Sequence, residues 1–377
     1  MHMKHTFCRL RLAVAASLAV ACMAAQAQGD KWVIGQSAPM SGSNAVFGKD
    51  IHDGASAYFA ALNAKGGVQG RAVELVTLDD KNDRKLAAEN AKKLLQDRNL
   101  LALFGFASAT LSLDALPLAE KAEVPFFAPF SGANPVRVHN PVLFTMRASY
   151  GEEMEKILNF WTSLGLKRVT VVYYDDEVGK QNFEVVQQYL KKVNLTPQSL
   201  ALKRNVAVTK ADVQTLVGQQ PDLVLHTILS GAAAQFQKDL VEMGRVVPTS
   251  SLSFVGADQF ISAAGPAASG VSIAQVVPNP NSALPVVREC AKAVEAYGIK
   301  TPMNSTQLEA CIAAKTLAEG IRRAKKPVTA QSVLEALRNL GTYDLGGYKV
   351  AFSAGAQHGS KFVDLAMVTR EGKLTSR

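Results

Sequence analysis

Two acidic motifs contain the residues of this sequence that could most readily bind a metal ion or act in catalysis. Asp79-Asp80 and Asp175-Asp176-Glu177 each follow an apolar run. Carboxylates in that position can bind a metal ion or act as acid and base. They also cap the following helix and favour its N-terminal dipole. We favour capping, because the sequence contains no GxxxxGKS/T, GxSxG or HExxH motif, and no GxGxxG follows the first predicted strand.

Cofactor motifs do not stand out either. Neither a CxxC pair nor a Cys/His cluster with zinc spacing occurs, and the six histidines are scattered. We therefore expect no cofactor and no metal site.

Three short loops of small and polar residues are better candidates for a binding site. They are 39–42 (PMSG), 105–110 (GFASAT) and 129–133 (PFSGA), and each follows a predicted strand. In open α/β sheets, ligands bind outside the carboxyl ends of the strands. Main-chain N–H groups at the next helix start, helped by Ser or Thr hydroxyls, can hold a carboxylate there. Ordinary turn chemistry uses the same residue types, so the prediction depends on the three loops occurring together.

These loops need elements that bring them to one edge, and alternating apolar patterns predict such elements. The first half reads as strands at 32–36, 73–78, 100–104 and 125–128, with helices at 48–65, 83–97 and 111–121. The second half reads as strands at 168–173, 198–202, 222–227 and 251–255, with helices near 151–164, 179–193, 209–218 and 231–243. Continuous apolar strands alternating with helices predict parallel, doubly wound sheets covered on both faces.

A short internal repeat suggests that the chain forms two related lobes. Phe47-Gly48-Lys49 and Val178-Gly179-Lys180 each open a predicted helix after a strand and a polar loop. Tyr and Asn recur at the same distances downstream, at Tyr58 and Asn63 and at Tyr189 and Asn194. We interpret this as a sign of duplication.

The last hundred residues follow a different pattern. After the stiff connector 278–281 (PNPN), helices are predicted near 283–297, 304–323 and 329–339, then a strand pair near 342–352 and a strand near 362–369. Three helices without intervening strands cannot form a third doubly wound sheet. We expect them to cover the two lobes.

Composition and the N-terminus indicate an exported globular protein. The 377 residues are 48% hydrophobic and 19% charged, with a net charge of +9. No Lys/Arg run exceeds two residues, so nucleic acid is not an expected partner. A basic start, an apolar run at 12–25 and Ala25-Gln26-Ala27 predict a signal peptide over 1–27, cleaved after Ala27, and a periplasmic product. Lipid attachment at Cys22 is a weaker alternative.

Export changes how the remaining cysteines are interpreted. Cys8 and Cys22 leave with the signal peptide, so Cys290 and Cys311 remain, on successive predicted helices. In an oxidising compartment they can pair, closing a loop of about 20 residues. Two buried thiols on apolar helix faces are the alternative.

The ordered motifs of this chain resemble the leucine/isoleucine/valine-binding protein family, the extracytoplasmic substrate-binding subunits of branched-chain amino-acid-type ABC importers. From about residue 30 onward the matching segments are 31–48 (KWVIGQSAPMSGSNAVFG), 63–70 (NAKGGVQG), 79–80 (DD), 104–110, 127–135 (FAPFSGANP), 146–150 (MRASY), 173–179 (YYDDEVG), 255–258 (VGAD) and 275–278 (QVVP). The resemblance implies a type I periplasmic binding protein: two α/β lobes joined by three crossovers that close on a ligand.

The resemblance also implies a ligand site. The ligand carboxylate would lie against Ser108-Ala109-Thr110 and Phe130-Ser131-Gly132, with Ser108 or Thr110 and Ser131 as hydroxyl donors. Asp258 matches the position that binds the ligand α-ammonium group, and Phe47 matches an aromatic wall of the pocket.

Departures from the family pattern leave the ligand open. Val178 and Leu229-Ser230 stand where second-lobe aromatics are common in the family, and the first-lobe disulfide of the branched-chain prototypes is absent. Leucine itself is therefore in doubt. Tyr150, Tyr173 or Tyr174 could compensate, or could serve the hinge or the core.

Together these interpretations predict a division and a function. Residues 28–147 plus 278–341 form the first lobe, and 148–277 plus 342–377 the second. The function is capture of an amino acid or related small carboxylate and delivery to a membrane permease by a monomeric, non-enzymatic protein. The alternatives are a periplasmic receptor for amides or aromatic acids and a secreted α/β hydrolase that uses Asp79, Asp80 or Asp175.

Overall fold

The computed structural model describes residues 31–42, 44–204 and 206–376. The predicted signal peptide, its cleavage site and Cys22 lie outside these residues. Within them, no helix has the length and apolar character needed to cross a membrane.

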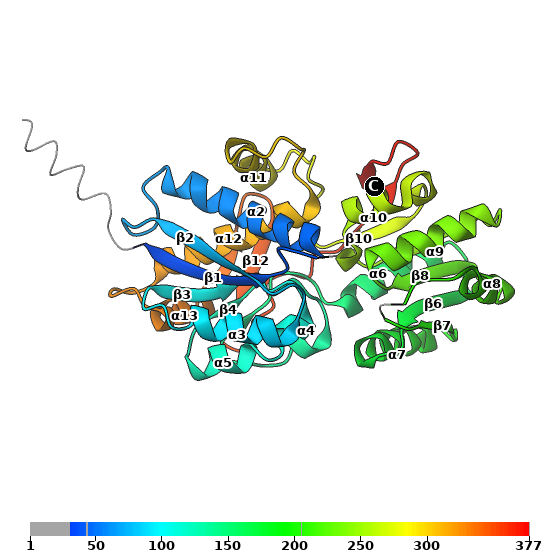
Figure 1. Ribbon diagram of the computed structural model, residues 1–377, viewed down its shortest axis with the longest axis horizontal. Coiled ribbons are helices and arrows are strands. Elements are labelled where there is room, and N and C mark those ends of the chain that lie inside the picture. The colour runs from blue at the N-terminus through cyan, green and yellow to red at the C-terminus, as the bar shows by residue number, and fades with distance from the viewer. Residues whose placement is uncertain (1–30, 43, 205, 377) are drawn as a thin grey trace, which may run out of the picture.

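Two separate sheets define two lobes, as predicted (Figure 1). The first sheet is parallel throughout, in the order β2 (Val73–Asp79), β1 (Trp32–Ala38), β3 (Leu100–Phe104), β4 (Phe126–Phe127), β5 (Leu143–Phe144). The second has the order β14 (Leu374–Ser376), β13 (Asp364–Val368), β10 (Ser272–Gln275), β9 (Thr249–Ser251), β8 (Leu223–Thr227), β6 (Val169–Tyr174), β7 (Gln198–Leu202). Only β13 and β14 run antiparallel to their neighbours. The chain passes between the lobes three times, at 145–149, 276–284 and 353–363.

Helices cover both sheets. Those of the first lobe are α2 (Ala45–Asn63), α3 (Arg84–Leu94), α4 (Ala109–Ser112), α5 (Leu116–Lys121), α11 (Pro285–Ala296), α12 (Ser305–Arg323) and α13 (Ala330–Arg338). Those of the second are α6 (Tyr150–Ser163), α7 (Glu177–Lys192), α8 (Lys210–Gly218), α9 (Ser230–Glu242) and α10 (Ala257–Ala264). Short 3₁₀ turns lie at Asn134–Val136, Ser253–Val255 and Gly265–Ala268.

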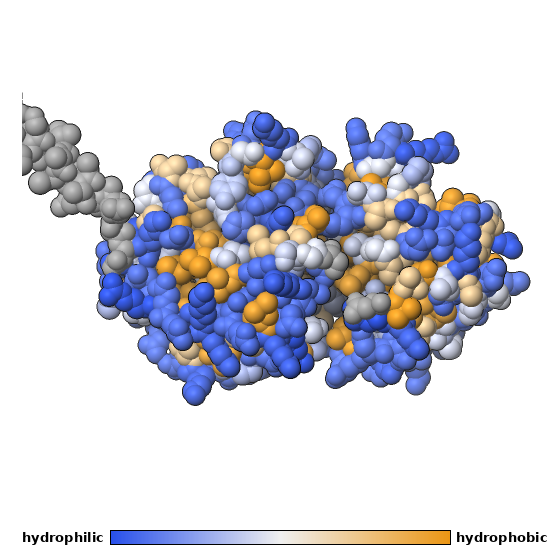
Figure 2. Space-filling model, in the orientation of Figure 1, coloured by the Kyte–Doolittle hydropathy of each residue, from blue (hydrophilic) through white to orange (hydrophobic). Residues whose placement is uncertain are grey.

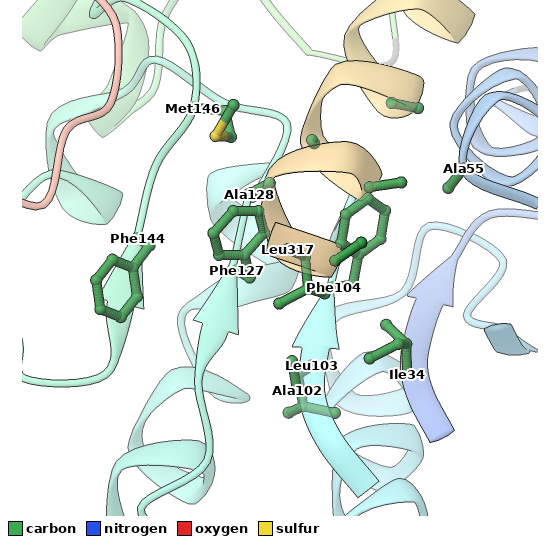
Figure 3. Packing of buried hydrophobic residues seen from close by; sticks show 14 of the residues in the cluster. Ile34, Ala55, Ala102, Leu103, Phe104, Phe127, Ala128, Phe144, Met146 and Leu317 are labelled. Carbon is green, nitrogen blue, oxygen red and sulfur yellow. The ribbon is translucent and has the colours of Figure 1, made fainter. Parts of the chain in front are cut away.

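Aromatic side chains from neighbouring strands form the first-lobe core. Phe104, Phe127 and Phe144 lie on β3, β4 and β5, with Leu317 of α12 among them (Figure 3). The rings of Phe104 and Phe127 stack with centroids 6.4 Å apart. Because the strands are buried on both faces, their apolar runs are continuous rather than alternating.

The C-terminal hairpin corrects the predicted division of the chain. β11 (Gly341–Asp344) and β12 (Lys349–Phe352) form a two-stranded sheet that packs on the first lobe, whereas 342–377 was expected in the second. The Phe352 ring lies 5.3 Å from that of Phe144 and 6.1 Å from that of Phe127. The chain therefore crosses for the third time after the hairpin, at 353–363. A strand pattern alone does not show which core its apolar face joins.

Helices α11 and α12 are joined by a disulfide between Cys290 and Cys311, the paired alternative of the sequence analysis. Both residues are fully buried. Closing a loop of 21 residues stabilises a fold by roughly 3 kcal/mol.

The internal repeat has a structural counterpart at its glycines. A Cβ on Gly48 would lie 2.0 Å from the carbonyl oxygen of Pro39, and one on Gly179 would lie 1.9 Å from that of Tyr174. In each lobe the first turn of the helix thus passes directly over the main chain that leads into it.

We expect Gly48→Ala and Gly179→Ala each to destabilise the protein by about 1–3 kcal/mol, because a main-chain carbonyl cannot move aside as a side chain does. Gly151→Ala is the matched control. It is also helical, but its Cβ would meet nothing closer than 3.7 Å, so alanine should be neutral or stabilising. Urea denaturation of the three variants tests this, and equal effects at all three sites would contradict the close-approach explanation.

Candidate functional site

The acidic motif after β2 shapes the first loop of the site. Asp79 accepts N–H bonds from Met40 and Lys81, both at 2.9 Å, and the hydroxyl of Ser41 at 2.6 Å. Burial alone would raise the pKa of Asp79, but these hydrogen bonds outweigh it and lower that pKa. Asp80 is fully buried and accepts the hydroxyl of Ser37 at 2.9 Å. Asp79 therefore organises loop 39–42 and Asp80 binds Ser37 of β1, and neither caps α3, which Asp83 caps.

The second acidic motif is a cap, as predicted. Asp176 accepts the N–H of Gly179 at 2.9 Å at the start of α7, and its carboxylate also meets Arg204. Asp175 is an exposed partner of Lys180. Among the described residues, none of these four carboxylates is hydrogen-bonded to a histidine, a cysteine or another carboxylate, the usual partners of a catalytic acid or base. Those residues also contain no His/Cys/Asp/Glu cluster that could hold a metal ion.

The loop after β3 places Ser108, Ala109 and Thr110 at the start of α4. The Ser108 hydroxyl oxygen accepts the Leu111 N–H at 3.2 Å, and Thr110 is exposed. A hydroxyl that accepts an N–H keeps its own proton to donate. The helix begins at Ala109, two residues earlier than predicted, because Ser108 is its N-cap.

The loop after β4 is buried. Phe130 and Ser131 are each 2% exposed, and the ring of Phe47 packs edge-on against Phe130 with centroids 6.2 Å apart. The Ser131 Oγ accepts the Ala133 N–H at 3.2 Å and lies 3.3 Å from the Tyr150 hydroxyl. When Tyr150 donates, Ser131 keeps its proton for a further acceptor. Gly132 accepts the Tyr150 N–H at 2.9 Å, which fixes this loop to the start of α6.

A buried ion pair that sequence analysis missed lies beneath this loop. Arg147, 3% exposed, donates from Nε and Nη2 to Glu309 of α12 at 2.8 and 2.6 Å. Its guanidinium also lies 5.7 Å from the centre of the Phe130 ring. Burial alone would lower the pKa of Arg147, but the Glu309 charge outweighs it and keeps the group cationic. The signal in the sequence was a glutamate within an otherwise apolar run, 308–314 (LEACIAA).

Glu153, a second buried acid that was not predicted, connects α6 to the turn that precedes α10. Glu153 is fully buried and accepts the N–H and the hydroxyl of Ser253 at 2.7 and 2.8 Å. Phe254 follows, and its ring lies 5.1 Å from that of Tyr150. Glu153 thus positions the 3₁₀ turn that leads into α10.

We expect this site to make stability depend on pH. Burial raises the pKa of Glu153 to about 7, from 4.5 in an exposed chain. A carboxyl group whose pKa is higher in the folded protein contributes stability that is complete below its pKa in the unfolded chain. This stability is lost as the pH rises through its pKa in the folded protein. The free energy of unfolding of Glu153→Gln, relative to that of the wild type, should therefore rise by on the order of 3 kcal/mol between pH 4.5 and pH 8. Urea midpoints of both proteins across that range measure it, and parallel pH profiles would contradict it.

Asp258 lies in the first turn of α10. Its side chain is exposed to solvent, yet the surrounding protein raises its pKa by desolvation. The adjacent Gln259 donates to Asp50 of α2 at 3.1 Å, which brings the two lobes into contact.

The contacts above link into a closed series, or ring, that joins the two lobes. From Phe47 the ring runs through Phe130 and Ser131 to Tyr150, then to Phe254 and along the turn to α10. Gln259 returns it to α2 through Asp50. The surface is furrowed between the two lobes (Figure 2). Of the predicted residues, this ring contains Phe47, Phe130, Ser131 and Tyr150, with Asp258 beside Gln259. Among the described residues, Ser108 and Thr110 make no hydrogen bond to this ring, whereas Ala109 is buried in the same hydrophobic cluster as Tyr150.

The remaining tyrosines have structural partners. Tyr173 stacks on Phe183 at 5.1 Å, and the Tyr174 hydroxyl accepts the Leu229 N–H at 3.3 Å. A separate cavity of about 640 Å³ lies between the second and third crossovers, beside Pro278, Tyr348 and Phe362. None of the predicted ligand residues lines it.

Comparison with known proteins identifies the family. The model of the periplasmic binding protein family matches residues 31–373. The chain belongs to this family. The leucine/isoleucine/valine-binding protein resemblance and the type I periplasmic binding fold are thereby confirmed. Family and fold are those of substrate-binding proteins, which are not enzymes.

Individual relatives are distant. A Leu/Ile/Val-binding protein homolog 7 of Brucella melitensis biotype 1 is 24% identical over 361 residues, covering 90% of this chain and 89% of that protein. An amino acid binding protein of Pseudomonas aeruginosa is 26% identical over 224 residues, and the match spans 55% of this chain and 60% of that protein. The crystal structure of a substrate-binding periplasmic protein from Ralstonia solanacearum is 31% identical, covers 92% of this chain and all of that one, and has a TM-score of 0.86.

Proposed function

We propose that this protein captures an amino acid or related small carboxylate between its lobes and delivers it to the membrane permease of an ABC importer. The ring of contacts supports this most directly. It links loops of the first lobe to the first turn of α10, where Asp258 lies next to Gln259. The names of the Brucella and Pseudomonas relatives agree with this ligand class.

The proposed site divides the ligand between the lobes. Ser108 or Thr110 and the main-chain N–H of Ala109 hold the carboxylate, with Ser131 as a further hydroxyl donor and Gly132 and Tyr150 fixing its loop. Asp258 receives the ammonium group, whose three N–H donors need acceptors once water is removed. Phe47 and Phe130 line the ligand's apolar side. Contacts split in this way are complete only when the lobes are closed, so ligand binding favours closure.

We also propose that the chain is exported, that its signal peptide is removed after Ala27, and that it acts as a monomer. The disulfide between Cys290 and Cys311 supports an oxidising compartment.

A thermal-shift screen of residues 28–377 tests the ligand class. The panel contains α-amino acids, the same side chains as simple carboxylic acids, aromatic acids and amides. A ligand present at 100 times its dissociation constant stabilises by about 2.7 kcal/mol. We expect stabilisation by at least one compound with a carboxylate. A hit confined to neutral amides would reject the proposed carboxylate site.

A further inference from the structure

A hydrogen bond joins the two lobes. Asp50, one helical turn after Phe47 on α2, is 9% exposed. One carboxylate oxygen accepts the Gln259 Nε2 of the second lobe at 3.1 Å, and the other accepts the Gln307 Nε2 of α12 at 3.3 Å. The bond to Gln307 lies within the first lobe. The bond to Gln259 joins the two lobes and exists only while they are close.

Gln259 is held in place for this contact. Its side chain folds over the main chain of Gly256, where a Cβ would lie 1.7 Å from the Gln259 Oε1. Gly256 has a φ of +65°, which glycine adopts readily, and is the residue before α10. Since Asp258 is the neighbour of Gln259, the contact with Asp50 also sets how far Asp258 lies from the first lobe.

Negative charges near Asp50 oppose the approach of the two lobes that the Asp50–Gln259 hydrogen bond requires. The Asp53 charge on α2 and the Asp258 charge on α10 act on Asp50, and the amides of Asn304, the N-cap of α12, and of Gln307 on α12 hydrogen-bond to it. Burial, together with the Asp258 and Asp53 charges, raises the pKa of Asp50 to about 6. When the second lobe swings away, Asp258 and part of the burial go with it. The protonated form of Asp50 is therefore favoured in the closed state.

We propose that Asp50 and Gln259 are positioning residues that form a charge-dependent latch between the lobes. The hydrogen bond holds α10 against α2, and the facing Asp50 and Asp258 carboxylates repel each other until a positive charge or a proton relieves them. The ligand part rests on the proposed function: an ammonium group beside Asp258 would supply that positive charge. Protonation of Asp50 would act in the same direction without ligand.

The test uses ligand-free protein, so that its outcome is independent of ligand binding. Spin labels on cysteines replacing Lys93 of α3 and Gln188 of α7, both exposed, report the distance between the lobes. Cys290 and Cys311 are bonded to each other and do not take up label. The distance distribution is measured at pH 5 and pH 8 for the wild type, Asp50→Asn, Gln259→Ala and the control Ser262→Ala, an exposed position on α10.

In the wild type and the control, the ratio of closed to open molecules should fall roughly tenfold from pH 5 to pH 8, the effect of one unit of pKa difference. Asp50→Asn should remove this pH dependence and keep the higher closed fraction at pH 8. Gln259→Ala should lower the ratio roughly tenfold at pH 5, the loss expected for one hydrogen bond of this kind.

Identical distributions in all four proteins at both pH values would overturn the proposal, as would a wild-type pH response that survives in Asp50→Asn. Neither result bears on whether a ligand binds, and a failed ligand screen leaves these distances unaffected.

Discussion

Arg147→Met should lower the free energy of unfolding by about 3–5 kcal/mol, the typical cost of leaving one partner of a buried ion pair unpaired. Glu309 would remain buried on α12 without the two N–H donors that now reach it at 2.8 and 2.6 Å. Phe130 would also lose the guanidinium near its ring. Urea denaturation measures the loss.

Two further variants separate charge from packing. Arg147→Met combined with Glu309→Leu should recover most of the loss, because replacing both members of a buried pair with apolar groups is often neutral. Arg84→Met removes an equally short contact with Asp114, but both side chains there are more than 40% exposed. That variant should cost at most about 1 kcal/mol. Equal losses at Arg147 and Arg84 would contradict the structural role given to burial.

Asp258→Asn should weaken ligand binding by roughly 30-fold to several thousand-fold, equivalent to about 2–5 kcal/mol, while the fold stays intact. The ligand ammonium would keep its place in the closed cleft but lose its charged acceptor. Among the described residues, Asp258 makes no hydrogen bond to another protein group, so its loss should not destabilise the protein. Calorimetry with the compound identified by the thermal-shift screen measures the change.

Asp175→Asn is the matched control for Asp258→Asn. It also removes one exposed second-lobe carboxylate, but Asp175 pairs with Lys180 on α7 rather than with the ring of contacts. Its affinity should stay within twofold of the wild type. Ser131→Ala should give an intermediate loss of about tenfold, since it removes one hydroxyl. Unchanged affinity in both Asp258→Asn and Ser131→Ala would remove the proposed site.

The sheet-forming half of the fold follows from the sequence because its signal is local. Strands such as β1 and β3 are buried along their whole length, so continuous apolar runs identify them. The two-residue strands β4 and β5 carry too little pattern for their pairing to be predicted. The hairpin 341–352 was assigned to the wrong lobe for a related reason: Phe352 is an ordinary strand residue until its contacts with Phe127 and Phe144 are known.

The site divides in the same way. Loop residues such as Ser108 and Ser131 were predicted because their types and their place after a strand suggest carboxylate binding. Glu153, Arg147 and Asp50 were missed because their importance comes from partners 100, 162 and 209 residues away in the chain. A charged residue that is buried only by distant segments has no local pattern that distinguishes it from a solvated one.

We propose that the two lobes hold a small acid without changing it. Isothermal titration of residues 28–377 with the screened ligand, followed by release of the ligand and its identification by NMR, tests this claim directly. We expect saturation at one ligand per chain and recovery of the same compound after prolonged incubation. Catalytic consumption of the compound, or no saturable binding by any carboxylate in the panel, would contradict it.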